Sequence, residues 1–302
     1  MIRLLHVVTL ELKEFYDPKL YPAYAILSHR WKRRKEGGKL IDLEVSCEQL
    51  RDGSGCAEGL EKIRRACEAI REFPVEWIWI DSCCIDKNDA VEHTEAINSM
   101  YQWYAESYVC IAYLDDVDAF EDVRNSDWFR RGWTLQELIA PERLLFYNTY
   151  WQGCGSRNYY DPGLEQHTFQ DKSFAISEIT RIDVELLRLQ DRKKIKRKLD
   201  SIPACQKMSW ASNRTTTKEE DIAYCLIGIF NIPHMYLKRG EGKRAFIRLQ
   251  EEIIKQSNDL TFFMIASGNC TSMPYAFRIQ YWASSSVTTY HQGIFGAKII
   301  TC

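Results

Sequence analysis

The sequence has no long hydrophobic run and almost no excess of charge of either sign. None of its apolar segments reaches the ~18 residues that a membrane-spanning helix needs, so we do not expect a membrane protein. Forty basic residues nearly balance 42 acidic ones, giving a formal charge of -2, which argues against a protein whose main task is to coat nucleic acid. The apolar residues 1–10 are followed by Glu11 and Lys13 without a small-residue cleavage site, and therefore predict a first strand rather than a signal peptide.

Several enzyme motifs are also missing. Neither Gly-x-x-x-x-Gly-Lys-Ser/Thr nor Gly-x-Gly-x-x-Gly occurs, so nucleoside triphosphatases and Rossmann dehydrogenases would lack their phosphate-binding loops. The absence of Gly-x-Ser-x-Gly weighs against an α/β-hydrolase. The 11 cysteines include the neighbours Cys83 and Cys84, but there is no Cys-x-x-Cys and no histidine cluster at ligand spacing. We therefore predict reduced thiols, no metal site and no permanently bound cofactor.

Short apolar runs alternate with helical patterns over the first 150 residues. The runs cover residues 24–27, 77–80, 109–114 and 144–147, and the helical patterns cover 59–71, 92–104 and 134–139. Strands and helices in this order predict an open α/β domain with a mostly parallel sheet and helices on both faces. In such sheets ligands bind beyond the carboxyl ends of the strands, where the strand order reverses.

The pattern changes after residue 150. Turn-forming residues at 153–156 and 161–163 predict an irregular linker. Beyond it, Thr217 and Glu220 have the spacing of a capping box before a helix, and a second amphipathic helix follows Gly242. We therefore divide the chain into three parts. Residues 1–165 form an α/β domain, residues 166–266 form a mainly helical region, and residues 267–302 form a C-terminal segment with one or two expected strands.

Polar residues follow the ends of the predicted strands and are candidates for ligand binding. They are Ser28, His29, Arg30 and Trp31 after the first strand of the α/β pattern, Asp81 and Asp86 after the second, and Asp116 after the third. Structural roles remain the alternative: aspartates such as Asp81 and Asp116 often cap helices or form turns. For His29, a supporting hydrogen bond is the alternative to a role as catalytic base.

Glu137 is the sharpest catalytic candidate, because it follows Trp133 by four residues on one helical face. An indole beside a carboxylate suits a ligand in which a flat ring is joined to a sugar. The ring stacks, and the carboxylate stabilises positive charge at the anomeric carbon during glycosidic cleavage. Nearby, Arg30, Arg130 and Arg131 can hold phosphates. The alternative places Trp133 in the core and pairs Glu137 with an arginine.

Two basic runs allow several interpretations. Residues 32–35 are all basic, and residues 192–198 contain six cations in seven positions. Either run suits a nuclear import signal or a phosphate-binding arm. Because the overall charge is near zero, we favour solvated linkers and do not expect nucleic-acid binding.

Several long motifs resemble the fungal heterokaryon incompatibility (HET) domain. They are YAILSHRW at 24–31, WIWIDSCCIDK at 77–87, EAINSMYQWY at 95–104 and WFRRGWTLQELIAP at 128–141. Residues 208–211, 220–230 and 240–242 resemble the helical region that commonly follows this domain, so the resemblance covers most of residues 20–265. It implies a cytoplasmic fungal protein, with nuclear entry through the basic runs as a further option. Such a protein triggers programmed cell death when different hyphae fuse, acting through self-association and protein partners.

HET domains are also similar to TIR domains, some of which cleave NAD+ at the nicotinamide bond. WTLQEL at 133–138 resembles the TIR run Trp-Cys-x-x-Glu-Leu, whose glutamate is catalytic, and Thr134 stands in place of its cysteine. The resemblance implies a TIR-like, flavodoxin-like sheet, NAD+ as substrate and Glu137 as the catalytic residue. It also implies that Trp31 and Trp133 shape the nicotinamide pocket while Arg30 faces the pyrophosphate. The alternative is a death-signalling adaptor that oligomerises without turnover.

Overall fold

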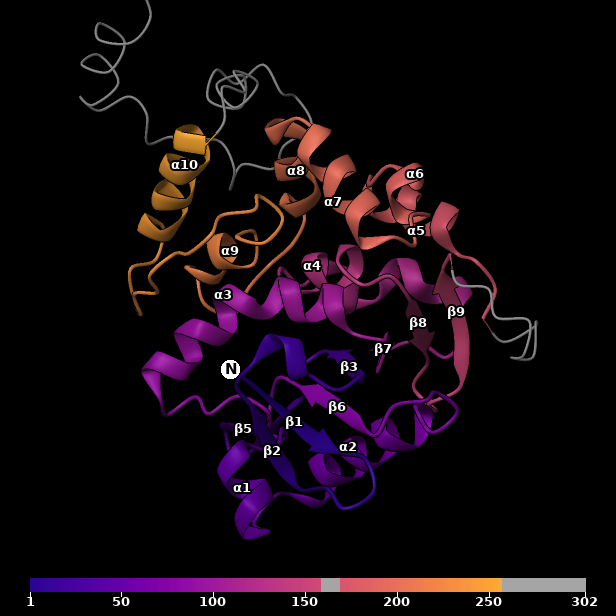
Figure 1. Cartoon of the computed structure of the whole chain (residues 1–302). Coiled ribbons are helices and arrows are strands. Elements are labelled where there is room, and N and C mark those ends of the chain that lie inside the picture. The colour runs from indigo at the N-terminus through magenta and orange to yellow at the C-terminus, as the bar shows by residue number, and fades with distance from the viewer. Residues whose placement is uncertain (159–168, 257–302) are drawn as a thin grey trace, which may run out of the picture.

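The computed structural model describes residues 1–158 and 169–256 of the chain (Figure 1). Its centre is a seven-stranded sheet with the order β2-β1-β6-β3-β7-β8-β9. The strands are β1 (Ile2–His6), β2 (Leu12–Phe15), β3 (Tyr24–His29), β6 (Trp77–Ile80), β7 (Val109–Tyr113), β8 (Leu144–Tyr147) and β9 (Gly153–Arg157). A separate hairpin consists of β4 (Arg33–Glu36) and β5 (Lys39–Asp42).

The four central strands β6, β3, β7 and β8 are parallel, as the sequence predicts. Their residues are almost all buried, because helices cover both faces. The prediction of a mostly parallel sheet does not hold at the edges, where β1, β2 and β9 run antiparallel to their neighbours. The connections β1–β2 and β8–β9 are only a few residues long, which suits hairpins but not the crossover that a parallel pair requires.

Helices cover both faces of this sheet. Figure 1 shows α3 (Ala90–Glu106) and α4 (Thr134–Ile139) on one side and α2 (Ala57–Ala69) on the other, with α1 (Cys47–Asp52) nearby. The three helices predicted for this part of the chain are therefore confirmed. The side chain of Asp89 caps α3 by accepting hydrogen bonds from two backbone amides of its first turn. The 3-10 helices are η1 (Pro18–Leu20), η2 (Phe120–Asn125) and η3 (Asp127–Arg130).

The strand order reverses at β3. This strand comes first among the four parallel strands in the chain, yet it lies between the second, β6, and the third, β7. Ligands of open α/β sheets bind at the carboxyl ends of the strands at such a reversal. Residues 28–31, at the end of β3, and residues 113–116, at the end of β7, therefore occupy the expected place for a site.

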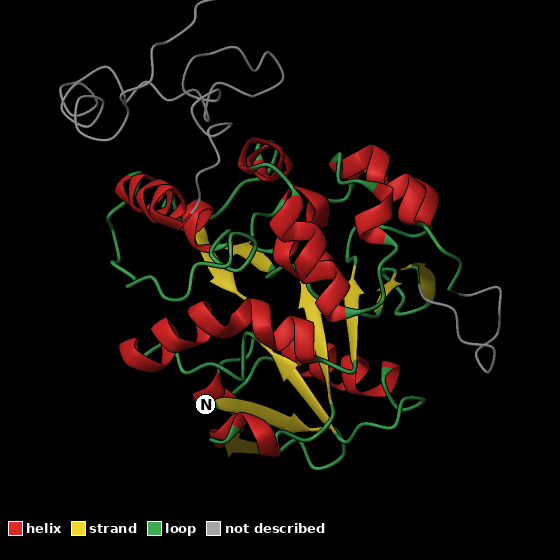
Figure 2. Cartoon of the chain, turned by 45° about the horizontal axis from the view of Figure 1, so that its top comes forward, coloured by secondary structure: helices red, strands yellow, loops and turns green. Residues whose placement is uncertain are grey.

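A second group of helices lies beyond α3 and α4 (Figures 1 and 2). It comprises α5 (Ser173–Thr180), α6 (Val184–Leu187), α7 (Arg192–Ser201), α8 (Ala204–Ala211), α9 (Asp221–Tyr224) and α10 (Arg244–Gln256). In α10 the buried residues Ala245, Leu249 and Ile253 recur every four residues, which confirms the amphipathic helix predicted after Gly242. In the part of the chain that the structure describes, no helix combines the length and apolar character needed to cross a membrane.

Four details of the sequence prediction are wrong. Residues 153–156 belong to strand β9, which pairs with β8, rather than to a linker, and Gly155 fits closely beside Phe120 and Lys172. Thr217 does not cap α9, which has only four residues and begins after Glu220 without a side-chain cap. The two basic runs are not linkers: one lies in the exposed strand β4, and the other forms α7.

In α7 the apolar residues Ile195 and Leu199, one turn apart, are buried while the cations face outward, which explains why a charged run forms a packed helix. The predicted turn at 161–163 and the segment 267–302 lie outside the described residues.

Candidate functional site

Glu137 of α4 meets the end of β3. The hydroxyl of Ser28 donates a hydrogen bond to Glu137 Oε2 at 2.5 Å. Ser28 is fully buried and Glu137 is 7% exposed. None of the ion pairs formed among residues 1–158 and 169–256 involves Glu137, so its carboxylate is not locked to a guanidinium.

Burial raises the pKa of Glu137 to about 7. The hydrogen bond from Ser28 lowers the pKa, the Asp81 carboxylate raises it, and the Arg131 guanidinium and the Tyr104 hydroxyl lower it. Because burial outweighs the stabilising contacts, the carboxyl group titrates near neutral pH. A carboxyl with such a pKa beside a strand end is typical of functional sites, although structural networks also produce such shifts.

Trp128 holds Ser28 in place. Its indole Nε1 donates to Ser28 Oγ at 2.8 Å, and its ring packs edge-on against Phe146 of β8. Ser28 therefore accepts from a buried indole and donates to the carboxylate, which fixes the direction of its hydroxyl proton. Sequence reasoning missed this role of Trp128, although the residue lies within the WFRRGWTLQELIAP motif.

His29 lies between two carboxylates. Its Nε2 is 3.2 Å from Glu44 Oε2 and 3.6 Å from Asp81 Oδ1, and its side chain is 1% exposed. Burial alone would raise the pKa of Glu44, but His29 and Lys62 outweigh it and hold that pKa well below its usual range. His29 thus has the supporting hydrogen bond that was the alternative to catalysis, while its Nδ1 finds no hydrogen-bond partner among the described residues.

Trp31 is joined to Asp81 across the same edge. Its indole Nε1 donates to Asp81 Oδ2 at 2.8 Å, and the Lys87 ammonium lies 3.3 Å from the centre of its ring. Burial lowers the pKa of Lys87, while the Asp81 carboxylate opposes that shift. The structure therefore brings His29, Trp31 and Asp81 into one cluster. No feature of the sequence pointed to Glu44 or Lys62 as its further members, whereas Lys87 belongs to the polar residues that follow the second predicted strand.

Arg30 is engaged by carboxylates. Its Nε and Nη2 donate to the two oxygens of Asp115 at 3.2 and 3.1 Å, and its Nη1 pairs with Asp127. Arg30 therefore binds Asp115, which follows β7, in a two-pronged geometry and at the same time holds η3 through Asp127. A phosphate at the Arg30 guanidinium would compete with these carboxylates for its N–H groups.

Asp86 and Asp116 make local contacts. Asp86 accepts a hydrogen bond from the Asn88 amide, as in an Asx turn. Asp116 accepts from the Ser126 hydroxyl at 2.7 Å and from the Asp127 amide at 2.8 Å, joining η2 and η3 to the end of β7. Asp86 therefore has a turn role, and Asp116 has a capping role at the first amide of η3. These structural roles are the alternative that the sequence left open.

Trp133 stands immediately before α4 and is half-buried. Its indole Nε1 donates to Asp221 Oδ2 of α9 at 3.3 Å, so its polar edge faces the helical group rather than Ser28. Burial raises the pKa of Asp221, and this hydrogen bond opposes the shift. Within the described residues, no three His, Cys, Asp or Glu side chains are grouped to hold a metal ion.

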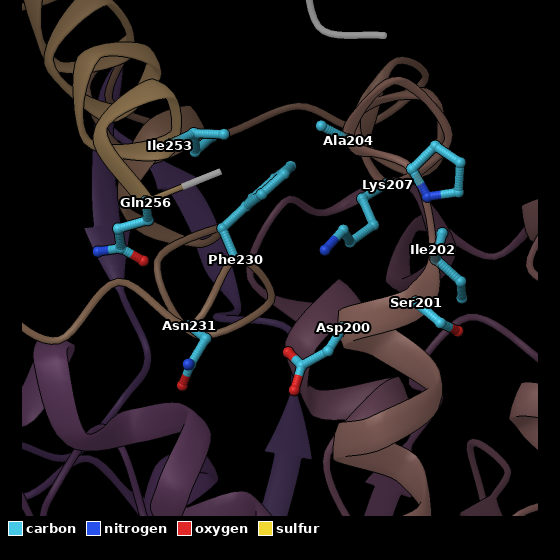
Figure 3. Close-up of a pocket in the computed structure, with 10 residues that line it drawn as sticks. Asp200, Ser201, Ile202, Ala204, Lys207, Phe230, Asn231, Ile253 and Gln256 are labelled. Carbon is cyan, nitrogen blue, oxygen red and sulfur yellow. The ribbon is translucent and has the colours of Figure 1, made fainter. Parts of the chain in front are cut away.

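Two described cavities lie away from Glu137. One, of about 480 Å³, is an open pocket lined by residues of α7, α8 and α10 and by residues 230–231 after α9, with the side chains of Lys207 and Phe230 beside it (Figure 3). The other, of about 690 Å³, lies beside the β1–β2 hairpin and is lined in part by Trp77, Lys13 and Arg51. Neither is lined by any of the site residues predicted from the sequence.

Comparison with known proteins gives two findings. Residues 24–121 match the family described as "Heterokaryon incompatibility protein (HET)". This range contains Ser28, His29 and Asp81, while Glu137 lies beyond it. The chain is also 38% identical over 254 residues to the vegetative incompatibility protein HET-E-1 of Podospora anserina. The alignment covers 79% of this chain and 17% of that relative's length. No solved structure matches the chain.

Proposed function

Because the chain is a HET-domain protein, we propose that it acts in heterokaryon incompatibility and triggers cell death by cleaving NAD+ at the nicotinamide–ribose bond. The reaction consumes water and yields nicotinamide, ADP-ribose and a proton. Since this chain spans 17% of HET-E-1, the activity of that longer protein supports the proposal only through the shared domain.

The observation that carries the proposal is the Glu137 carboxyl group. It is buried and free of ion pairs among the described residues, and it accepts a hydrogen bond from Ser28 at the end of the strand where the sheet order reverses. A carboxylate in a poorly hydrated site stabilises nearby positive charge more strongly than one in water. Glycosidic cleavage passes through an oxocarbenium-like state with positive charge at the anomeric carbon. Glu137 would stabilise that charge as nicotinamide leaves.

The strand order adds support. Among the parallel strands, β6, β3, β7 and β8 are the second, first, third and fourth in the chain, which is the order of flavodoxin-like sheets. This order agrees with the TIR-like character that the motifs imply. In the proposed site Trp31 borders the nicotinamide, Trp133 does so only if its ring leaves Asp221, and Arg30 binds the pyrophosphate in competition with its carboxylate partners. His29 and Asp81 complete the polar wall, and no bound cofactor is required.

The protonation state gives the expected pH dependence. Only the ionised form of Glu137 stabilises positive charge, and its pKa is about 7. The rate of nicotinamide release should therefore rise between pH 6 and pH 8. Release that falls over the same range would instead assign Glu137 the role of a proton donor.

Self-association forms part of the proposal. The 7% exposure of Glu137 means that NAD+ reaches it only after residues around the end of β3 rearrange. Association between chains can drive that rearrangement. Specific activity should then rise with protein concentration rather than stay constant.

The same low exposure favours a second candidate function. If the Glu137 carboxylate never becomes accessible to NAD+, the domain would act as a death-signalling adaptor that recruits partners without turnover. Expression in fungal cells separates the two: the enzyme predicts that NAD+ falls before viability is lost, and that Glu137→Gln prevents both. If Glu137→Gln kills cells as efficiently as the wild type while NAD+ stays constant, the adaptor is correct and the enzyme is wrong.

A further inference from the structure

The short helix α4 is held at its beginning by a buried arginine from the helical group. Arg214, 5% exposed, follows α8 in the chain. Its Nη1 donates to the Arg131 carbonyl and to Thr134 Oγ1, each at 2.8 Å, and its Nε donates to the Trp210 carbonyl at 3.3 Å. A six-residue helix is marginal by itself, so contacts of this kind determine where it lies.

Backbone contacts reinforce this junction. Arg131 and Thr215 form an isolated parallel bridge, in which the Gly132 amide donates to the Thr215 carbonyl at 2.8 Å. The Thr215 amide donates to the Arg130 carbonyl at 2.6 Å. A β-carbon at Gly132 would lie 2.5 Å from a methyl group of Thr216, so the two segments pack too closely for any larger residue.

A continuous path of contacts links Arg214 to the Glu137 carboxylate. The Thr134 hydroxyl, which accepts from Arg214, donates to the Trp128 carbonyl at 2.5 Å. The indole of Trp128 donates to Ser28, which donates to Glu137. Thr134 is also on the same helix as Glu137, three residues before it. The arginine therefore contacts the helix that carries the carboxylate and, through the Thr134 hydroxyl, is linked to Trp128, which holds the hydrogen-bond donor of the carboxylate.

We propose that Arg214 and Thr134 are positioning residues for Glu137, so that the helical group of the chain sets the position of the carboxylate in the α/β domain. The catalytic part of this inference rests on the proposed function, whereas the geometric part does not. Electrostatics agree with it: burial lowers the pKa of Arg214 to about 10, and the Glu137 carboxylate opposes that shift, as expected for neighbouring charges.

The chain offers matched variants for the test. Arg214→Met removes the guanidinium. Thr134→Val keeps the side-chain shape but removes the hydroxyl, and Thr134→Ser restores the hydroxyl. Asn98→Ala is the control, because Asn98 exchanges two hydrogen bonds with the Met235 backbone and so joins α3 to the helical group away from α4.

The first readout is nicotinamide release from NAD+. We expect kcat to fall roughly tenfold or more in Arg214→Met and Thr134→Val with KM changed less than about twofold, since a small displacement of a catalytic group acts on the chemical step. Thr134→Ser should recover most of the loss, and Asn98→Ala should keep the wild-type kcat. Equal losses in Asn98→Ala and Thr134→Val would show a merely structural effect and overturn the inference.

The second readout does not depend on catalysis. Each variant is combined with Glu137→Gln, and the difference between the two unfolding free energies is followed against pH. This difference grows above the ordinary pKa of 4.5 and levels off at the pKa of Glu137 in the folded chain. The pH of levelling off should be near 7 in the wild type and Asn98→Ala, and should move upward in Arg214→Met, which loses a neighbouring cation. An unchanged pH of levelling off in Arg214→Met refutes its electrostatic coupling to the carboxylate. A wild type that releases no nicotinamide refutes the proposed function instead, and this pH then decides the role of Arg214.

Discussion

Replacing Glu137 with glutamine should stabilise the protein at alkaline pH and leave its stability unchanged at acidic pH. Glutamine has the shape of glutamate and can accept the hydrogen bond from Ser28, but it carries no charge. The substitution therefore removes one ionisable group from a buried position and leaves the side-chain shape nearly unchanged. Any pH dependence of the difference between the two proteins belongs to this carboxyl group.

The magnitude follows from the pKa of Glu137 in the folded chain, about 7, against its ordinary value of 4.5. Below pH 4.5 the group is protonated in both states and contributes no difference. As the pH rises toward 7 the unfolded chain ionises first, so the folded state loses about 3 kcal/mol relative to the variant. In a chain of 302 residues such a loss lowers the melting temperature by about 5 °C.

The assay compares urea unfolding of the wild type and Glu137→Gln at pH 5 and pH 8. The variant should be more stable by about 1 kcal/mol at pH 5 and by about 3 kcal/mol at pH 8. Other groups that titrate in this range, such as half-buried His93, whose pKa burial lowers to about 4, are common to both proteins and cancel. If the difference between the two proteins is the same at both pH values, Glu137 is not a desolvated carboxyl group, and the reasoning is wrong.

Three further substitutions test the contacts around the site and in the helical group. Ser28→Ala removes the hydrogen bond that lowers the pKa of Glu137, so the pH at which nicotinamide release is half-maximal should move upward, as a pH–rate profile would measure; an unmoved profile contradicts the contact. Leu199→Ala in the basic helix α7 should cost about 2–5 kcal/mol in urea unfolding, whereas Lys196→Ala on its exposed face should cost less than about 0.5 kcal/mol. Equal effects of the two substitutions would mean that α7 is not packed as described.

The central strands could be predicted from the sequence because each is a short, continuous apolar run between polar residues. Residues 77–80 and 144–147 are such runs, and they form β6 and β8 within those same limits. Strand β9 could not be found in this way, because Gly153–Arg157 has the composition of a turn. It pairs with β8, and Gly155 leaves room for the side chains of Phe120 and Lys172, which come from other parts of the chain and are not part of any local pattern.

The helix α7 was missed for a different reason. Six cations in seven positions dominate its composition, while its packing depends only on Ile195 and Leu199. Two apolar residues one turn apart are a weak signal beside so much charge. The tertiary contact that buries them decides the outcome.

The residues of the candidate site could be predicted from the sequence, whereas their contacts could not. Strand ends placed Ser28 and Asp81 at one edge of the sheet, and the spacing from Trp133 singled out Glu137. The partners of these residues depend on the folded chain: Ser28 and Glu137 are 109 positions apart, and the role of Trp128 follows from the direction of its indole. Trp133 itself turns toward Asp221, which helical spacing alone could not show.

Nicotinamide release by the purified chain is the most direct measurement of the central claim. Wild type and Glu137→Gln are incubated with NAD+ at pH 8 over a wide range of protein concentration, and the products are separated. The account predicts nicotinamide and ADP-ribose in equal amounts from the wild type, with a rate per chain that grows with concentration, and none from the variant. Intact NAD+ at the highest wild-type concentration, or equal release by Glu137→Gln, would contradict it.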